Sequence, residues 1–222
     1  MSGTIAIFGA GGGLGLATAQ RFAQEGFRVA LIGRTQAKLD DLAGRVDGET
    51  ITFATDVTDH DQLARTVARI GDIEVLAFGA TGMDEVMAAA LRLGARDLRF
   101  QLELRLVAPV VATQRVLPSM LARGSGTLLY ATGTSAVQPI GMISNVGAAS
   151  AGLRSYVHTL HEAASEKGIY AGLLMVGGLV VGSEAQARFG DMDIPTLPPQ
   201  VLAQVLWDMH TGRDQVERIV TP

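Results

Sequence analysis

Short apolar runs alternate with amphipathic stretches along this chain. The apolar runs are too short for helices and predict strands that are buried on both faces. The longer stretches repeat apolar residues every three or four positions, as helices do. We expect strands at 4–8, 27–32, 50–54, 73–78, 127–131, 169–176 and 216–220, and helices at 14–24, 35–45, 59–70, 83–93, 97–123, 144–167 and 198–210. This alternation predicts an α/β fold: a doubly wound parallel sheet of about seven strands, covered by helices on both faces.

The composition is that of a single domain covering residues 1–222. With 48% hydrophobic and 18% charged residues, the chain can bury a full core without disulfides or metal. The absence of cysteine excludes disulfides, cysteine nucleophiles and thiolate metal sites. A net charge of -4 gives no reason to expect nucleic acid or an anionic membrane as a partner. The apolar segment 173–181 is too short to span a bilayer, and no signal peptide precedes the first strand, so we expect a cytoplasmic protein.

The first predicted strand leads into a glycine-rich loop that is followed by a predicted helix. Glycines permit a tight turn and let the backbone approach a ligand, while the helix N-terminus offers N–H groups to a phosphate. This order predicts a dinucleotide-binding loop made of Gly9, Gly11, Gly12, Gly13, Leu14 and Gly15. Leu14 rules out the spacing G-x-G-x-x-G. Both G-x-x-x-G-x-G and, through Gly12, G-x-x-G-x-x-G fit, so the loop alone does not choose between them.

Residues after the second and third strands indicate which nucleotide is preferred. A carboxylate after the second strand would bind the ribose hydroxyls of NAD, but this chain has Arg34 and Thr35 there. An arginine fork and a hydroxyl suit a 2′-phosphate, so we expect NADP, with NADPH preferred over NADH; the alternative is that Arg34 is an ordinary surface residue. Asp56 and Val57 follow the third strand, where they would bind adenine, although Asp56 fits a turn equally well.

Together with other segments over nearly the whole chain, these residues resemble the short-chain dehydrogenase/reductase family. The other matching segments are 113–118 with Met120, Gly126 before the fifth strand, and Gly168-Ile169 before the sixth. The resemblance implies a Rossmann-type sheet and a bound NAD(P) that Gly79, Ala80 and Gly177 also contact. It further implies a small-molecule substrate and a homodimer or homotetramer built on the helices at 97–123 and 144–167.

The catalytic positions that the resemblance implies do not hold the family's residues. The family uses an asparagine, a serine, a tyrosine and, four residues after the tyrosine, a lysine; here those positions are Arg105, Gly133, Val146 and Ser150. No Y-x-x-x-K occurs in the chain. From residue 124 to 153 there is no charged residue and no histidine, and Tyr130 lies within a strand. Because valine cannot act as a general acid, the family's usual carbonyl reduction is not expected.

Several residues are candidates for a different chemistry. Arg105 would bind an acidic substrate or stabilise an oxyanion, unless it is a surface or subunit-contact arginine beside Glu103. Hydrogen bonds to a substrate or to the nicotinamide ribose would come from Thr132, Thr134, Ser135, Asn145 and Ser150, unless these side chains only satisfy the loop backbone and a helix start. His158 and His161 lie about 18 Å along the helix from Val146 and have no third ligand, so no metal site is expected.

Three functions remain open at this point. The first is a redox enzyme with a rebuilt site, in which NADPH supplies hydride and the proton comes from elsewhere. The second is an inactive dehydrogenase that binds NADP(H) as a sensor or scaffold, and the third is a non-redox isomerase or lyase on the same fold. The segment 182–197 suits a lid over a pocket or a plain surface loop, and it does not name a substrate.

Overall fold

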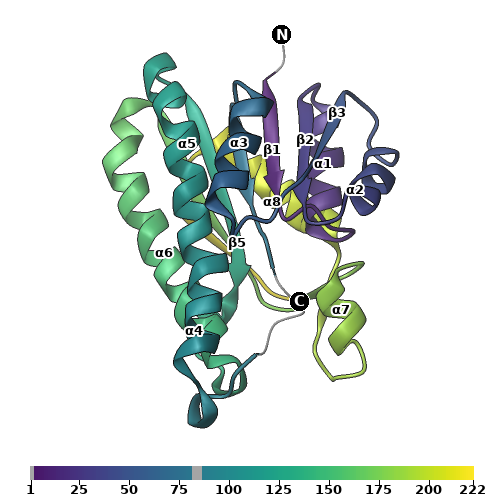
Figure 1. The fold of residues 1–222 in the computed structure, drawn as a ribbon, viewed down its shortest axis with the longest axis vertical. Coiled ribbons are helices and arrows are strands. Elements are labelled where there is room, and N and C mark those ends of the chain that lie inside the picture. The colour runs from purple at the N-terminus through teal and green to yellow at the C-terminus, as the bar shows by residue number, and fades with distance from the viewer. Residues whose placement is uncertain (1–2, 82–86) are drawn as a thin grey trace.

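Seven parallel strands form the central sheet in the order β3–β2–β1–β4–β5–β6–β9 (Figure 1). The computed structural model describes residues 3–81 and 87–222. The strands are β1 (Thr4–Phe8), β2 (Arg28–Gly33), β3 (Thr50–Ala54), β4 (Val75–Phe78), β5 (Gly126–Gly133), β6 (Ile169–Val176) and β9 (Glu217–Val220). The predicted α/β fold with a seven-stranded parallel sheet is confirmed, and each strand begins and ends within two residues of its predicted limits.

Helices cover both faces of this sheet (Figure 1). On one face lie α1 (Leu14–Gln24), α2 (Gln36–Ala43) and α8 (Pro199–Gly212). On the other lie α3 (His60–Ile70), α5 (Ala108–Arg123) and α6 (Ser144–Ala164), and α4 (Ala95–Leu102) extends the α5 rod past the edge where the strands end. The chain is therefore wound in both directions from β1, which places β1 and β4 at the centre of the sheet.

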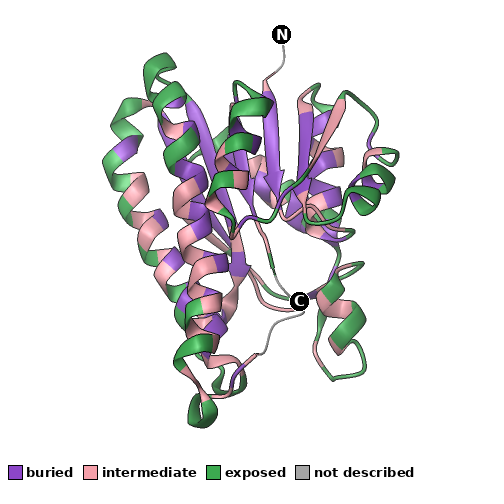
Figure 2. Ribbon diagram, in the orientation of Figure 1, coloured by how far each residue is buried: buried purple, intermediate pink, exposed green. Residues whose placement is uncertain are grey.

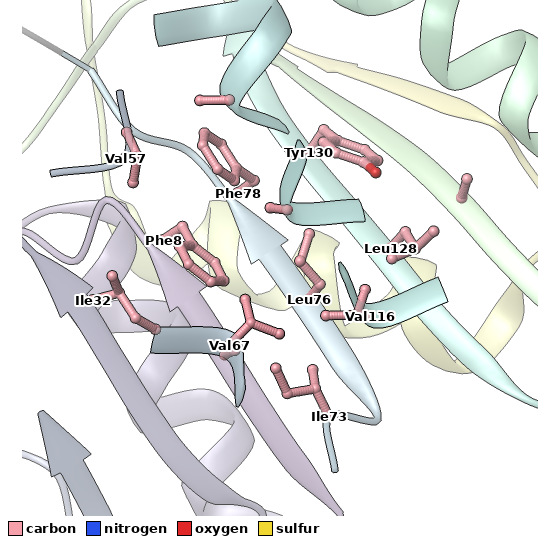
Figure 3. Close-up of a cluster of buried hydrophobic side chains, with 14 of the residues drawn as sticks. Phe8, Ile32, Val57, Val67, Ile73, Leu76, Phe78, Val116, Leu128 and Tyr130 are labelled. Atoms are coloured by element: carbon pink, nitrogen blue, oxygen red, sulfur yellow. The ribbon is translucent and has the colours of Figure 1, made fainter. Parts of the chain in front are cut away.

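Alternate strand residues enter two separate cores. In β1, Ala6 and Phe8 face the helices α3, α5 and α6, whereas Ile5 and Ile7 face α1 and α8. Phe8 stacks on Phe78 of β4 with ring centroids 5.6 Å apart (Figure 3). The central strands β1, β2, β4, β5 and β6 are buried along most of their length, whereas the edge strands β3 and β9 are only partly buried, and the helices expose their outer faces (Figure 2). Burial on both sides explains why the strand sequences are apolar throughout instead of alternating.

The helix predicted at 83–93 is wrong for the part that the structure describes. Residues 83–86 of that prediction lie outside the described residues, and the rest contains only a 3-10 turn, η1 (Ala90–Arg92). Contacts from the start of α6 hold this stretch. The Asn145 side chain accepts a hydrogen bond from Ala88 N at 3.0 Å, and Ser144 donates to Ala88 O from its N–H and its hydroxyl. Tertiary contacts therefore override the local helical pattern.

The helix predicted at 97–123 is one rod with an irregular centre. Between α4 and α5 lies a π-helical segment, η2 (Glu103–Val107), in which Ala108 N donates to Glu103 O five residues earlier. Pro109 lies four residues after Arg105 and has no N–H to donate to the Arg105 carbonyl. The wider π turn accommodates this missing bond.

The segment 182–197 has secondary structure of its own. It contains α7 (Glu184–Phe189), and β8 (Thr196–Leu197) pairs in parallel with β7 (Leu179–Val180). Short turns complete the described chain: η3 (Thr134–Ala136) and η4 (Gly141–Ile143) before α6, and η5 (Ser165–Lys167) after it. In Figure 1, α7 lies beyond the carboxyl edge of the sheet, on the side of α1 and α2.

Candidate functional site

The loops after β1 and β4 meet at the carboxyl edge of the sheet. β1 lies between β2 and β4, and in doubly wound sheets ligands bind at the position where the winding direction changes. Gly79, directly after β4, donates from its backbone to Phe8 O at 2.9 Å. The glycine loop and the loop containing Gly79 and Ala80 therefore form one continuous surface.

Two of the loop glycines are required by packing. Gly9 has φ +89°, and a Cβ at this position would lie 2.4 Å from Ala80 Cα. A Cβ on Gly15 would lie 2.9 Å from Ala10 Cα, within the same loop. The N–H groups of Gly9 and Ala10 both donate to Ile32 O, at 3.0 and 2.9 Å, which ties the loop to the end of β2. These contacts fix the entry into α1.

The middle of the loop presents unbonded backbone. Among the described residues, no N–H from Gly11 to Gly15 donates a hydrogen bond to the protein. The N-cap residue of α1, Gly13, provides no side-chain cap, and the first turn contains no acidic residue. A Cβ on Gly11 would meet no atom within 4 Å. Five free N–H groups at the positive end of a helix fit the diphosphate of a dinucleotide.

The segment after β7 lies against the same loop. A Cβ on Gly12 would come within 3.0 Å of Gly182 O, and one on Gly13 within 3.1 Å of Ser183 Cβ. Further out, Lys38 of α2 forms an ion pair with Glu184 of α7 at 3.1 Å, and both side chains are exposed. The start of α7 therefore borders one side of the glycine loop.

Arg34 and Thr35 lie exposed where β2 ends and α2 begins. Thr35 is the N-cap residue of α2, but its hydroxyl makes no capping bond. In the next loop the Asp56 carboxylate accepts hydrogen bonds from Thr58 N at 2.9 Å and Thr58 Oγ1 at 2.7 Å. Asp56 thus closes a turn, as one of the two interpretations held, while Val57 packs in the core (Figure 3).

Gly177 lies where β6 ends, beside the last strand. Its N–H donates to Val220 O at 2.8 Å, and a Cβ there would lie 2.8 Å from Thr221 Cγ2 and 3.4 Å from Thr134 Cγ2. A side chain at this position would therefore crowd the ends of β5 and β9.

Arg105 projects from the π-helical segment into the protein. It is only 9% exposed, so the interpretation as a surface arginine is wrong. Its Nε donates to Gln101 Oε1 at 2.7 Å, while Glu103 is paired with His60 at 2.6 Å. Burial lowers the pKa of Arg105 to about 10, so the guanidinium remains charged at neutral pH.

The end of β5 faces Arg105 across a small cavity. The cavity has a volume of about 10 Å³, room for roughly one water molecule. The Thr132 hydroxyl donates to Ser150 Oγ at 2.8 Å, and both side chains are buried. The cavity is lined by Phe78, Ala80, Arg105, Pro109, Ala131, Thr132 and Leu153. The structure thus brings three predicted residues, Ala80, Arg105 and Thr132, together at the cavity. A fourth, Ser150, contacts this group through its hydrogen bond with Thr132.

The other polar candidates have structural partners. Asn145 is fully buried and its side-chain oxygen also accepts from Val146 N, so it anchors the residue-88 stretch to α6. The Thr134 carbonyl accepts from Val137 N and Gln138 N in the turn after β5. Val146, where the resemblance implies a tyrosine in the family, is buried.

Tyr130 belongs to the core. Its hydroxyl lies 2.5 Å from Thr113 Oγ1, which itself donates to Pro109 O, so the tyrosine is the donor of the pair. Burial, with a smaller effect from Tyr156, raises the pKa of Tyr130 far above its usual value. Such a phenol cannot exchange protons with a substrate at the edge of the sheet.

Each histidine in the described chain has a separate partner. His158 bonds to Glu217 at 2.7 Å, and His161 lies 3.0 Å from Ala171 O. His210 pairs with Thr127 at 2.9 Å. Among residues 3–81 and 87–222, no group of three or more acidic or histidine side chains is placed to hold a metal ion. No helix of that same part of the chain is long and apolar enough to cross a membrane.

Several residues that line the cavity, and Gln101, which bonds to Arg105 without lining the cavity, could not be identified from the sequence. Gln101, Phe78, Pro109 and Leu153 are ordinary apolar or amide residues, and only their position in the fold makes them part of the site. Gln101 had one available signal, because it precedes Arg105 by four residues, about one helical turn.

Comparison with known proteins agrees with this geometry. The family model described as short chain dehydrogenase matches residues 3–191. The chain belongs to the short-chain dehydrogenase/reductase family. It is similar to serine 3-dehydrogenase from Rhizobium radiobacter, with 29% identity over 173 residues, which cover 76% of this chain and 69% of that protein.

Solved structures of this dehydrogenase/reductase family have the same fold. One short chain dehydrogenase/reductase family protein superposes with a TM-score of 0.90 at 21% identity, over 99% of this chain and 96% of that one. A metagenomic short-chain oxidoreductase in complex with NADP superposes with a TM-score of 0.83 at 21% identity, over 100% and 98% of the two chains. The family is one of oxidoreductases that bind a nicotinamide cofactor.

Proposed function

We propose that this protein is an NADP(H)-dependent oxidoreductase that acts on a carbonyl, imine or enone group of a small molecule through a non-standard catalytic site. The observation that carries the proposal is the row of unbonded N–H groups from Gly11 to Gly15 at the start of α1. A relative named as a dehydrogenase and a related structure that holds NADP support it.

The nucleotide would lie along the carboxyl edge, over β1. Its diphosphate would accept from the glycine-loop N–H groups, and Arg34 with Thr35 would bind the 2′-phosphate. Asp56 and Val57 would face the adenine, with Gly79, Ala80 and Gly177 closer to the nicotinamide. When bound, the reduced nicotinamide supplies a hydride.

The proton for the product would come from water or from the substrate. Val146 and Ser150 stand where the family has its tyrosine and lysine, and neither titrates near neutral pH. Of the described side chains that line the cavity, Arg105 alone is ionisable. The catalytic site would therefore stabilise charge through Arg105 and hydroxyl groups, without the tyrosine acid.

Equilibrium titration with NADPH and NADH tests the nucleotide assignment. We expect micromolar binding of NADPH, and we expect Arg34→Ala to weaken NADPH roughly 10-fold or more while leaving NADH unchanged, because NADH has no 2′-phosphate. Arg45→Ala is the matched control, because Arg45 is also an exposed arginine and lies just after the other end of α2. Absence of binding of either nucleotide up to millimolar concentration would end the proposal.

A catalytically inactive NADP(H) sensor or scaffold is the second candidate. The burial of Val146 and the Thr132–Ser150 bond favour it, because they leave no acid at the usual position. If NADPH binds but is not oxidised with any member of a broad carbonyl, imine and enone panel, this candidate replaces the first. Turnover without change in nicotinamide absorbance would instead indicate an isomerase or lyase.

We also propose that the protein forms a homodimer or homotetramer through α5 and α6, which lie on one face of the sheet and carry exposed residues along their outer sides. Sedimentation velocity measures the state directly, and a monomer at micromolar concentration would contradict this proposal.

A further inference from the structure

The cavity at Arg105 contains a cation whose end groups have no partner within the described part of the chain. Arg105 is 9% exposed and its Nε is bonded to Gln101. Among the described residues neither Nη group of Arg105 donates a hydrogen bond, and neither is fully sealed from solvent. The unbonded Nη groups are thus the part of this side chain that a ligand can reach.

We propose that Arg105 binds an anionic oxygen of the substrate and that the substrate is a carboxylate, such as an oxo acid or the corresponding hydroxy acid. This assignment rests on the proposed oxidoreductase function for the reaction, but the anion site itself does not depend on it. Thr132 lines the same cavity and its oxygen can accept a hydrogen bond from a protonated group of the substrate.

The electrostatics of the cavity favour an anion. A buried guanidinium is costly unless an opposite charge or several hydrogen bonds compensate it. Over residues 3–81 and 87–222, the part of the chain that the structure describes, no carboxylate lines the cavity, and the nearest acid along the chain, Glu103, is engaged with His60 at 2.6 Å. Burial lowers the pKa of Arg105 only to about 10, so the charge persists at neutral pH. A ligand carboxylate would supply the missing counter-charge.

Size and position favour one oxygen atom at this point. The cavity of about 10 Å³ has room for a single water-sized group beside Arg105. Ala80 lines the cavity and also touches the glycine loop, since a Cβ on Gly9 would lie 2.4 Å from Ala80 Cα. A carboxylate oxygen bound here would therefore hold the rest of the molecule next to the proposed nucleotide crevice.

Calorimetric titration of the intact protein with small carboxylates, with and without saturating NADP⁺, tests the proposal. The probes are acetate, propionate, malonate and succinate, each compared with its neutral amide, together with inorganic phosphate. We expect at least one carboxylate to bind and its amide not to bind. Arg105→Gln should weaken that binding about 10- to 100-fold, the effect of losing a charge-assisted hydrogen bond. Arg105→Lys should retain part of it.

Arg99→Gln, on the exposed side of the neighbouring α4, is the matched control and should leave binding unchanged. If Arg105→Gln does not fold, as judged by circular dichroism, Arg105→Lys and rescue of Arg105→Ala by added guanidinium replace it. Equal binding by wild type and Arg105→Gln, binding of amides as tight as of acids, a preference for phosphate, or no carboxylate binding overturns the proposal. If NADPH binds but no carboxylate does, only the carboxylate site is overturned. If a carboxylate binds but NADPH does not, only the proposed redox function is overturned.

Discussion

At the scale of single residues, the glycines of the first loop serve two different purposes. Gly9 and Gly15 are fixed by contacts within the protein, whereas a Cβ on Gly11 would meet no atom within 4 Å. The sequence pattern could not distinguish these two roles, because glycine occurs at both kinds of position. The distinction comes from the neighbouring loop at Ala80, which only the fold brings near Gly9.

This difference predicts opposite behaviour for two substitutions. Gly9→Ala should lower the free energy of unfolding by about 1–3 kcal/mol, because it combines a positive φ with a backbone clash. Gly11→Ala should leave the free energy of unfolding nearly unchanged but weaken NADPH binding, because the added methyl group would enter the space proposed for the diphosphate. Urea unfolding and nucleotide titration measure the two effects. Equal loss of stability in both variants would contradict the packing described for Gly9.

Arg105 illustrates a second limit of the sequence at this scale. Its candidacy was visible from its position on the helix, but its burial was not, since a charged residue near Glu103 suits a solvent-exposed face equally well. Pro109 and the π-helical turn rotate the helix here, and no periodic pattern reveals such a turn in advance.

At the scale of elements, β9 is joined to α6 by charges. Glu217 accepts from Arg154 Nε at 2.7 Å and Nη2 at 3.0 Å, and it also bonds to His158 at 2.7 Å. The bond to Arg154, more than any other contact, holds the pKa of Glu217 below its usual 4.5. The carboxylate therefore stabilises the folded protein above that pH, and the contribution disappears as the pH falls through the lowered pKa.

Glu217→Gln should accordingly reduce stability at pH 7 by about 1 kcal/mol, the scale for a partly exposed charge network. The difference between wild type and variant should shrink once the pH falls below 4.5. Urea unfolding from pH 7 to pH 3 measures it, with Asp208→Gln, on α8, as a control. If the difference in stability stays constant over this pH range, ionisation of Glu217 does not contribute to the stability of the folded protein.

The strands were predicted more closely than the helices for a physical reason. A strand buried on both faces needs an apolar residue at nearly every position, so its limits are evident in the sequence. The stretch at 87–93 has a helical pattern but is held by Asn145 and Ser144 from a distant helix. Contacts of this kind between distant parts of the chain leave no local signal.

At the scale of the whole molecule, a buried histidine couples folding to pH. Burial, and secondarily Arg213, lowers the pKa of His210 to about 4. An unfolded chain takes up this proton near pH 6.5, so the unfolded state binds more protons than the folded state between pH 6.5 and 4. Stability should therefore fall as the pH decreases through that interval.

His210→Phe keeps the aromatic contacts with Phe22 and Trp207 but cannot titrate. Its stability should fall less than that of wild type between pH 7 and pH 4, by on the order of 2–3 kcal/mol. Thermal or urea unfolding at both pH values compares the two slopes. Parallel slopes would show that His210 is protonated in the folded protein.

The overall architecture and the family could be predicted from the sequence, whereas much less of the site could. Glycine spacing and Arg34 are local features, so the proposed nucleotide half could be described from them. The cavity joins the ends of β4 and β5 to η2 and α6, and residues such as Phe78 and Leu153 enter it only through that arrangement. The reacting half of the site is therefore a property of the tertiary fold.

The ion pair between Lys38 and Glu184 predicts that exchange of the proposed nucleotide depends on the salt concentration. Both charges are exposed, and ions screen such charges over about 8 Å at physiological ionic strength. Raising the salt concentration should loosen α7 and let NADH, which lacks the 2′-phosphate, dissociate faster in a stopped-flow displacement measurement. Glu184→Gln should dissociate fast at all salt concentrations; a variant as salt-sensitive as wild type would show that α7 does not govern exchange.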